Sequence, residues 1–213
     1  MPKLSYPHYT QMDNDTHLHG GGYRQCNLTV HAMFLDGACC GMAAVGAARN
    51  RMNEPESWLG FHLKKYGDTT DHNALTRCFK DVCNVDSYWT KTLSQTELKR
   101  ALDTGYAVPC GVRYKGGGHI VLVVGYNEKG VWVHDPYGQR DGSNDYYPPG
   151  KIGGHHGEYD YYQWATFGKI FFDEQGTDNS HTGWARVVER IGVSVGPAVL
   201  TGITEEERLS PKK

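Results

Sequence analysis

The sequence has no long hydrophobic run, no excess of basic residues and few cysteines. No apolar stretch approaches the roughly 18 residues that a membrane-spanning helix needs, and residues 1–19 lack the apolar core of a secretory signal. The formal net charge is -2, whereas dedicated nucleic-acid-binding proteins usually carry a clear basic excess. These absences predict a protein without a signal peptide that is cytoplasmic on synthesis, inserts into no membrane and binds no nucleic acid.

The cysteines and histidines do not form a recognisable metal motif. Six cysteines are too few for a disulfide scaffold in 213 residues, and the absence of a CxxC pair excludes zinc-ribbon and thioredoxin-type motifs. Histidines at 17, 19, 155 and 156 and the polar segment 141–145 carry possible metal ligands. Neither HExxH spacing nor the EF-hand pattern accompanies them. The sequence therefore predicts no metal and no other cofactor.

The composition is that of a folded protein, with 38% hydrophobic and 22% charged residues. No internal repeat and no linker-like segment interrupts the chain. We therefore expect a single domain over residues 1–213, with a C-terminal extension from about residue 184.

The first half of the chain has the periodicity of helices. Apolar residues are dense over 26–36, which predicts a buried helix that ends near Gly37 or continues to Gly41. Further helices are expected over 54–67 and 71–83. A fourth is expected over 94–105, where Ser94 and Glu97 have the spacing of a capping box.

The character changes after residue 105. Residues 106–114, 119–126 and 130–135 are apolar and rich in β-branched side chains, which predicts three strands. A helix or strand is expected within 161–172, and another within 184–200. Helices followed by strands indicate an α+β fold with an antiparallel sheet.

Four residues supply the groups that nucleophilic cysteine catalysis requires. Cys26 lies at a helix start, where the helix dipole favours a thiolate. His119 opens a buried strand and Asp135 ends the next one, so a hairpin would bring the imidazole and the carboxylate to one end of the sheet. The Gln11 side-chain amide and the Cys26 backbone N–H are candidate donors to an oxyanion. The sequence thus predicts Cys26, His119, Asp135 and Gln11 as catalytic residues.

Each of these residues also has an ordinary structural interpretation. A lone cysteine at a helix start is more often a buried thiol than a nucleophile. His119 also has an interpretation as a strand-edge histidine, which the preceding glycines disfavour, and Asp135, before Pro136, has one as a turn residue. The combination of all three in one chain favours the catalytic interpretation.

The tyrosine-rich segment 145–164 has two interpretations. Its rings would suit a groove that stacks on sugars or grips an extended peptide. The alternative is a stiff surface loop packed on the sheet. The sequence does not choose between the two, and no residue of the segment is assigned to the site.

Several segments resemble the papain-like cysteine peptidases of the bacteriocin-processing type, family thirty-nine of the cysteine peptidases. They are "QMDN" (11–14), "CNLTVHAMFL" (26–35), "LKRALDTGYAVPCGVRY" (98–114) and "GGHIVLVVGYNEKGVWVHDPYG" (117–138). The resemblance spans residues 9–140. It implies a papain-like fold, with the catalytic cysteine at a helix N-terminus packed on an antiparallel sheet.

The resemblance also implies the role of each site residue. Cys26 would be the nucleophile, His119 the general base and acid, Asp135 the residue that orients the imidazole, and Gln11 the oxyanion donor. The departures from the family pattern are a long insertion between residues 37 and 70 and an unmatched region after residue 140.

The expected activity is hydrolysis of an amide bond through a thioester acyl-enzyme. Processing peptidases of this type are commonly fused to a transporter, and this chain has no apparent membrane segment. A stand-alone form resembles a phage endolysin, which acts on bacterial peptidoglycan after release through a separate pore. Two alternatives stay open: a peptidase that processes leader peptides or other proteins, and a catalytically silent binding module. A peptide or peptidoglycan partner is expected in either enzymatic case.

Overall fold

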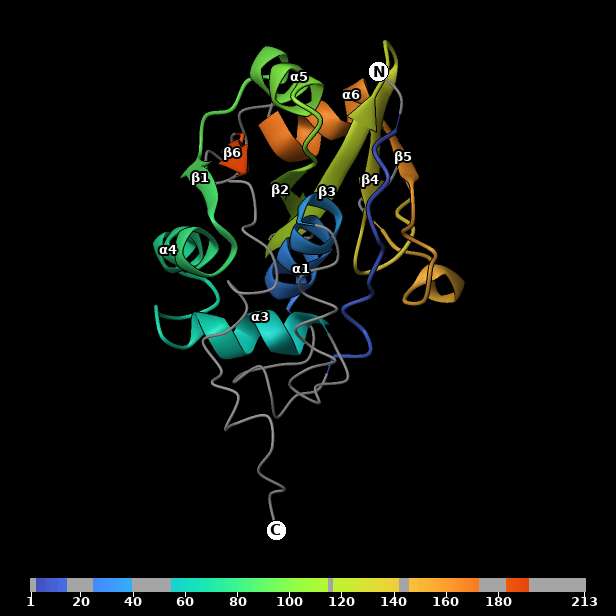
Figure 1. Ribbon diagram of the computed structural model, residues 1–213. Helices are drawn as coiled ribbons and strands as arrows, with labels where there is room; N and C mark the ends of the chain where they lie inside the picture. Colours follow the sequence, from blue (N-terminus) through green and yellow to red (C-terminus); the bar gives the residue numbers. More distant parts are fainter. Residues whose placement is uncertain are drawn as a thin grey trace.

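The described part of the chain forms one antiparallel sheet with helices on both faces (Figure 1). The computed structural model describes residues 3–14, 25–39, 55–114, 117–141, 146–172 and 183–191. Within these residues the sheet has six strands in the order β1-β6-β2-β3-β4-β5, and every pairing is antiparallel. The strands are β1 (Val85–Thr90), β2 (Val108–Tyr114), β3 (Gly117–Tyr126), β4 (Gly130–His134), β5 (Asp160–Gln163) and β6 (Ala185–Ile191).

The helices divide between two hydrophobic cores, one on each face of the sheet. One core joins the sheet to α1 (Cys26–Ala38), α3 (Pro55–Leu63) and α4 (His72–Cys83). The other core joins it to α5 (Gln95–Asp103), α6 (Trp164–Phe167) and the π-helical turn η2 (Gly168–Phe172). A short 3-10 turn, η1 (Pro149–Lys151), lies between β4 and β5. The described residues thus contain both the helices and the antiparallel sheet that a papain-like fold requires.

Strand β3 contributes side chains to the hydrophobic core on each face of the sheet. Its side chains alternate between the faces, as they must in a β-strand. Leu122 and Val124 belong to the core beneath α1, whereas Val121 and Val123 belong to the core beneath α5 and α6. All four side chains are fully buried, so β3 is a central strand covered on both faces.

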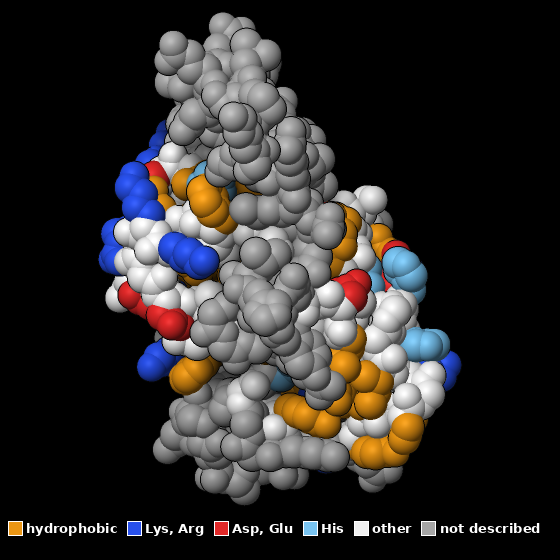
Figure 2. Space-filling model, turned by 90° about the horizontal axis from the view of Figure 1, so that it is seen from below, with side chains coloured by type: hydrophobic (Ala, Val, Ile, Leu, Met, Phe, Trp, Pro, Cys, Tyr) orange, Lys and Arg blue, Asp and Glu red, His pale blue; other side chains and the backbone are white. Residues whose placement is uncertain are grey.

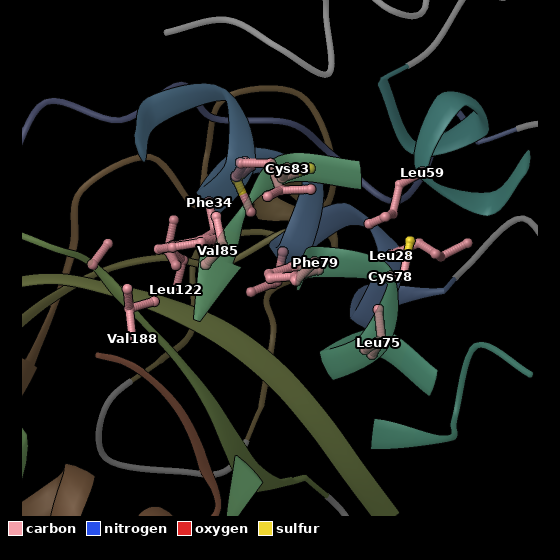
Figure 3. Close-up of a cluster of buried hydrophobic side chains, with 14 of the residues drawn as sticks. Leu28, Phe34, Leu59, Leu75, Cys78, Phe79, Cys83, Val85, Leu122 and Val188 are labelled. Carbon is pink, nitrogen blue, oxygen red and sulfur yellow. The ribbon is translucent and has the colours of Figure 1, made fainter. Parts of the chain in front are cut away.

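The core beneath α1 fixes the helix that carries Cys26. In the close-up, Leu28 and Phe34 of α1 lie among side chains from α4 and the sheet, including Phe79 and Leu122 (Figure 3). The Phe34 and Phe79 rings are stacked, with centroids 6.0 Å apart. Since α1 is buried over Leu28–Asp36, packing on most of its sides holds its position relative to the sheet.

The expected α+β fold is confirmed, and most predicted elements are found. Helix α4 begins after Asp71, whose side chain accepts hydrogen bonds from two backbone N–H groups. Ser94 and Glu97 form the predicted capping box of α5. The helix expected over 54–67 ends earlier, at Leu63.

One edge strand was not expected from the sequence, and two segments left open between helix and strand are resolved. No strand was expected at 85–90, yet β1 forms there and pairs with β6. Of the two buried positions in this strand, Val85 and Ser87, one holds a polar residue. The alternation of apolar and polar residues that marks a strand in a sequence is therefore weak here. The segment 184–200, expected to hold a strand or a helix, contains β6, which lies between β1 and β2. The segment 161–172 contains a strand and a helix in succession.

The surface charge is unevenly distributed on one face of the molecule. In the space-filling view, Lys and Arg side chains gather near the left edge, whereas His and hydrophobic side chains lie towards the right (Figure 2). Asp86 of β1 forms ion pairs with Lys80 at 2.6 Å and with Arg190 at 2.8 Å. Part of the positive charge at this edge of the sheet is thus paired. Among the described residues, no helix is long and apolar enough to cross a membrane.

Candidate active site

Cys26 is the first residue of α1. The preceding residue, Gln25, has a non-helical backbone and makes no side-chain cap. The Cys26 side chain is half-buried, and its thiol is free. Unpaired N–H groups at a helix start carry partial positive charge, so this position stabilises an anion on the sulfur.

His119 and Asp135 meet at one end of the β3–β4 hairpin, as the sequence predicts. The register pairs Leu122 with His134, which brings the residue after β4 beside the start of β3. His119 Nε2 donates to Asp135 Oδ1 at 2.8 Å, and both residues are buried. The His119 side chain also hydrogen-bonds Cys26. Because Nε2 is engaged by Asp135, Nδ1 is the ring nitrogen left for the thiol.

The charge state of His119 is set by two opposing effects. Burial lowers its pKa, since a desolvated imidazolium is unfavourable. The charge and the hydrogen bond of Asp135 act in the other direction, and so does Cys26. Together they raise the pKa of His119 above its ordinary value. An imidazolium is therefore stable beside Cys26, which is the arrangement that favours a thiolate–imidazolium pair.

Asp135 remains ionised although its side chain is fully buried. Burial raises the pKa of its carboxyl, but His119 and the hydrogen bonds from Tyr147 and from Tyr137 N more than offset this and lower the pKa below the usual value. Oδ1 also accepts from Tyr137 N at 2.9 Å. Oδ2 accepts from Tyr147 Oη at 2.5 Å and from Tyr162 Oη at 2.9 Å. All of the acceptor positions of this carboxylate are thus well supplied with donors.

The N-terminal segment holds Gln11 against the residue that follows Asp135. Gln11 N donates to Pro136 O at 2.9 Å, and Thr10 Oγ1 donates to the same oxygen at 3.1 Å. The Gln11 side chain is buried. Further along, Asn14 Nδ2 donates to Thr29 Oγ1 of α1 at 3.0 Å. Gln11 therefore lies on a short span tied to the Asp135 turn on one side and to the Cys26 helix on the other.

The same segment is fastened to the sheet over most of its length. Leu4 N donates to Val124 O at 2.7 Å. His134 Nε2 donates to Tyr6 O, and His8 Nε2 donates to Asp135 O, both at 3.1 Å. These contacts fix the path of the chain up to Gln11.

Three tyrosine rings surround the imidazole of His119. Those of Tyr114, Tyr137 and Tyr147 have centroids 6.3–6.4 Å from that of His119. Tyr114 and Tyr137 are half-buried, whereas Tyr147 is buried. The rings exclude water from one side of the imidazole and present an aromatic wall beside it.

The sequence did not assign Tyr147 or Tyr162 to the site. Both lie in the tyrosine-rich segment whose two interpretations stayed open. Their exposed neighbours, Tyr146 and Tyr161, are the same residue type, so composition alone does not reveal which ring is buried. In β5 the alternation of exposed and buried positions distinguishes Tyr162, but a strand of four residues is a weak signal.

The possible metal ligands are dispersed. Residues 17–19 and 142–145 lie outside the described residues. His155 is exposed, and its Nδ1 lies 3.4 Å from Glu158 Oε2. Within the described ranges, no group of three or more His, Cys, Asp or Glu side chains has the geometry of a metal site.

The fold and the site define the class of this protein. An α+β domain with a cysteine at the start of a buried helix, packed on an antiparallel sheet, is the architecture of papain-like cysteine peptidases. The sequence profile of the Peptidase_C39 like family matches residues 3–170, and the chain belongs to this family. It is a cysteine peptidase, a hydrolase that acts on peptide substrates. No curated protein and no solved structure gives a significant match to the chain.

Proposed function

We propose that Cys26, His119, Asp135 and Gln11 are the catalytic residues of this peptidase. The observation that carries the assignment is the continuous chain of side-chain contacts from Cys26 through His119 to Asp135. A thiol at a helix start, an imidazole and a buried carboxylate are the groups that form and stabilise a nucleophilic thiolate.

In the first step, His119 takes the thiol proton and the Cys26 sulfur attacks the carbonyl carbon of the scissile amide. The carbonyl oxygen becomes an oxyanion, which accepts hydrogen bonds from the Gln11 side-chain amide and the Cys26 backbone N–H. His119 then gives its proton to the nitrogen of the leaving amine as the C–N bond breaks. The product of this half-reaction is a thioester between Cys26 and the acyl group.

The second step regenerates the thiol. With the amine gone, His119 accepts a proton from a water molecule whose oxygen attacks the thioester carbonyl. The C–S bond breaks, the Cys26 sulfur recovers a proton from His119, and a carboxylic acid leaves. Asp135 stays ionised throughout and stabilises the imidazolium each time it forms.

We further propose that the substrate is the peptide part of bacterial peptidoglycan, as for an endolysin. The aromatic wall of Tyr114 and Tyr137 beside His119 supports this substrate, because aromatic rings stack on sugar faces and on short peptides with small side chains. His119 protonates the leaving amine, so this wall flanks the leaving-group side of the scissile bond. Release from a phage-infected cell would bring such an enzyme to the cell wall.

Mass spectrometry of digested peptidoglycan tests both proposals. Purified sacculi are incubated with the wild type, with Cys26→Ala and with Cys39→Ala. Cys39 is a matched control, because it follows the other end of α1 and is also a half-buried cysteine that forms no disulfide. We expect new peptide termini with the wild type and with Cys39→Ala, and none with Cys26→Ala.

Other results would reject one proposal or both. Equal digestion by Cys26→Ala would contradict the catalytic assignment. Intact sacculi together with cleavage of a linear peptide that contains a glycine pair would replace the endolysin proposal with a processing peptidase. Intact sacculi and intact peptides would favour a binding module.

A further inference from the structure

Two tyrosine hydroxyls converge on the Asp135 carboxylate oxygen that does not face His119. Tyr147 Oη lies 2.5 Å from Oδ2, and Tyr162 Oη lies 2.9 Å from the same atom. The carboxylate is fully buried, and the tyrosines are 3% and 1% exposed. These contacts thus form inside the protein, where unpaired polar atoms are costly.

The two tyrosines reach Asp135 from different parts of the chain. Tyr147 precedes the short turn η1, and Tyr162 belongs to β5 at the edge of the sheet. The ring of Tyr147 also packs against Tyr137, with centroids 4.9 Å apart and nearly perpendicular planes. Tyr162 belongs to the core beneath α5 and α6. Both hydroxyls are therefore held by rings that are themselves packed in place.

A carboxylate in this position needs its orientation fixed. Rotation about the last side-chain torsion of an aspartate is soft, because this torsion lacks sharp staggered minima. If the carboxylate turned, its oxygens would leave the line of the His119 Nε2–H bond. Two donors on Oδ2 oppose such a turn, while His119 and Tyr137 N hold Oδ1.

We propose that Tyr147 and Tyr162 are positioning residues, which hold the Asp135 carboxylate in the ionised state and orientation that support the His119 imidazolium. The inference rests on the proposed catalytic role of Asp135. The two tyrosines touch neither the sulfur nor the substrate in this role. They act through Asp135 on His119, and through His119 on Cys26.

The proposed role predicts the direction in which loss of a tyrosine hydroxyl shifts the pKa of Asp135. The Tyr147 hydrogen bond is one of the causes that lower the pKa of Asp135 against burial, so its loss raises that pKa. Asp135 then takes up a proton at a higher pH, and the imidazolium loses its support. The titratable and charged groups around Asp135 are His119 on β3, Cys26 on α1, His8 on the N-terminal segment, Arg140 after β4, Tyr147 before η1, and Asp160 and Tyr162 on β5.

The chain contains matched controls for both tyrosines. Tyr146 and Tyr161 are the sequence neighbours of Tyr147 and Tyr162, and they are 40% and 37% exposed. The hydroxyl of Tyr161 donates to Asn127 Oδ1 at 2.8 Å, away from Asp135. The substitutions Tyr146→Phe and Tyr161→Phe thus remove the same atom from the same segments without removing a donor from Asp135.

The test measures how fast iodoacetamide alkylates Cys26 across a range of pH. The rate reports the thiolate without requiring a substrate. We expect Tyr147→Phe and Tyr162→Phe each to move the acid limb of the profile upward by about one pH unit, and the double variant to move it further. At a given pH on the acid limb, this shift is about a tenfold loss of rate for each single variant. Neither control should move the limb.

A purely structural role predicts a different result. It would lower the folded fraction, measured by urea unfolding, and leave the limb in place for the folded molecules. Profiles of Tyr147→Phe and Tyr162→Phe that superimpose on those of their controls would overturn the inference. In an Asp135→Asn background, the tyrosine substitutions should cause no further shift.

The failure of this inference is distinguishable from the failure of the proposed function. Superimposed profiles combined with an inactive Cys26→Ala would overturn only the role of the tyrosines. Full activity of Cys26→Ala on sacculi would overturn the catalytic assignment and this inference with it.

Discussion

Asp135 and Arg186 are both fully buried charged residues, and the protein holds them in different ways. Asp135 pairs with an ionisable partner, His119, and receives donors on both oxygens. Arg186 instead donates to neutral acceptors: His31 Nε2 at 3.0 Å, Thr76 Oγ1 at 2.9 Å, Ser87 Oγ at 3.2 Å and His72 O at 3.0 Å. Its guanidinium also lies over the Phe79 ring, 5.1 Å from the centroid.

The difference indicates separate purposes for the two clusters. The partners of Arg186 come from α1, α4 and β1, so this residue of β6 ties four elements together. The Asp135 cluster leads through His119 to a half-buried thiol, Cys26. We infer that the first arrangement serves stability, and we propose that the second serves catalysis. The two clusters share α1, which carries Cys26 and His31.

The largest effect is expected from the loss of the imidazole. His119→Ala should reduce peptidase activity on sacculi by about 10³-fold or more, because no other group would move the protons. Its unfolding midpoint in urea should also fall, because the buried Asp135 carboxylate loses its charged partner, so the activity is compared per folded molecule. Activity within tenfold of the wild type would show that His119 is not the acid and base.

Arg186→Met should instead have a large effect on stability and only a small one on chemistry. The substitution keeps a long side chain but leaves several buried acceptors without donors, at a cost of roughly 2–4 kcal/mol. We expect this loss in urea unfolding, while the activity of the folded fraction stays near that of the wild type. The control is Arg190→Met on the same strand, where an exposed ion pair with Asp86 is lost and no measurable change is expected.

The two clusters should also respond oppositely to pH. Burial and the neighbouring Arg186 lower the pKa of His31 well below its ordinary value, whereas the pKa of His119 is raised. Below about pH 6.5, His31 binds a proton in the unfolded chain but not in the folded protein. His31 therefore lowers the free energy of unfolding as the pH falls. His119 contributes stability that is complete below about pH 6.5 and is lost as the pH rises through its raised pKa.

Paired unfolding experiments isolate each contribution. The measured quantity is the free energy of unfolding of the wild type minus that of the variant. For His31→Gln this difference should decrease as the pH is lowered from about 6.5. For His119→Gln it should decrease as the pH is raised from about 6.5. Each comparison subtracts the other buried histidines, which are common to both chains. Differences that follow the same pH trend would contradict this account of the two clusters.

The sequence predicted that His119 and Asp135 come together, because the signals for this placement are local. Cys26 at a helix start, His119 before an apolar run and Asp135 after the next strand each carry a signal within a few residues. The turn between β3 and β4 is short, so pairing these strands was enough to bring His119 and Asp135 together. The geometry of His119 and Asp135 therefore needed no long-range information.

The residues that support the site were not predictable in this way. Tyr147 and Tyr162 each have an exposed tyrosine as a sequence neighbour, and only the tertiary fold determines which of the two rings is buried. Arg186 lies on β6, which joins the sheet between β1 and β2 from the far end of the chain. A sequence pattern gives no reason to bury an arginine, because burial is favourable only after His31, Thr76 and Ser87 have been brought around it.

Competitive alkylation of two cysteines tests the central claim most directly. An unassisted thiol is mostly protonated at pH 6 and reacts slowly with iodoacetamide. Peptide mass spectrometry would compare the labelling of Cys26 and Cys39, at opposite ends of α1, in the wild type and in His119→Ala. The account predicts that Cys26 reacts at least about tenfold faster than Cys39 in the wild type, and that His119→Ala abolishes this advantage. Equal labelling of the two cysteines in the wild type, or an advantage of Cys26 that survives the loss of His119, would contradict it.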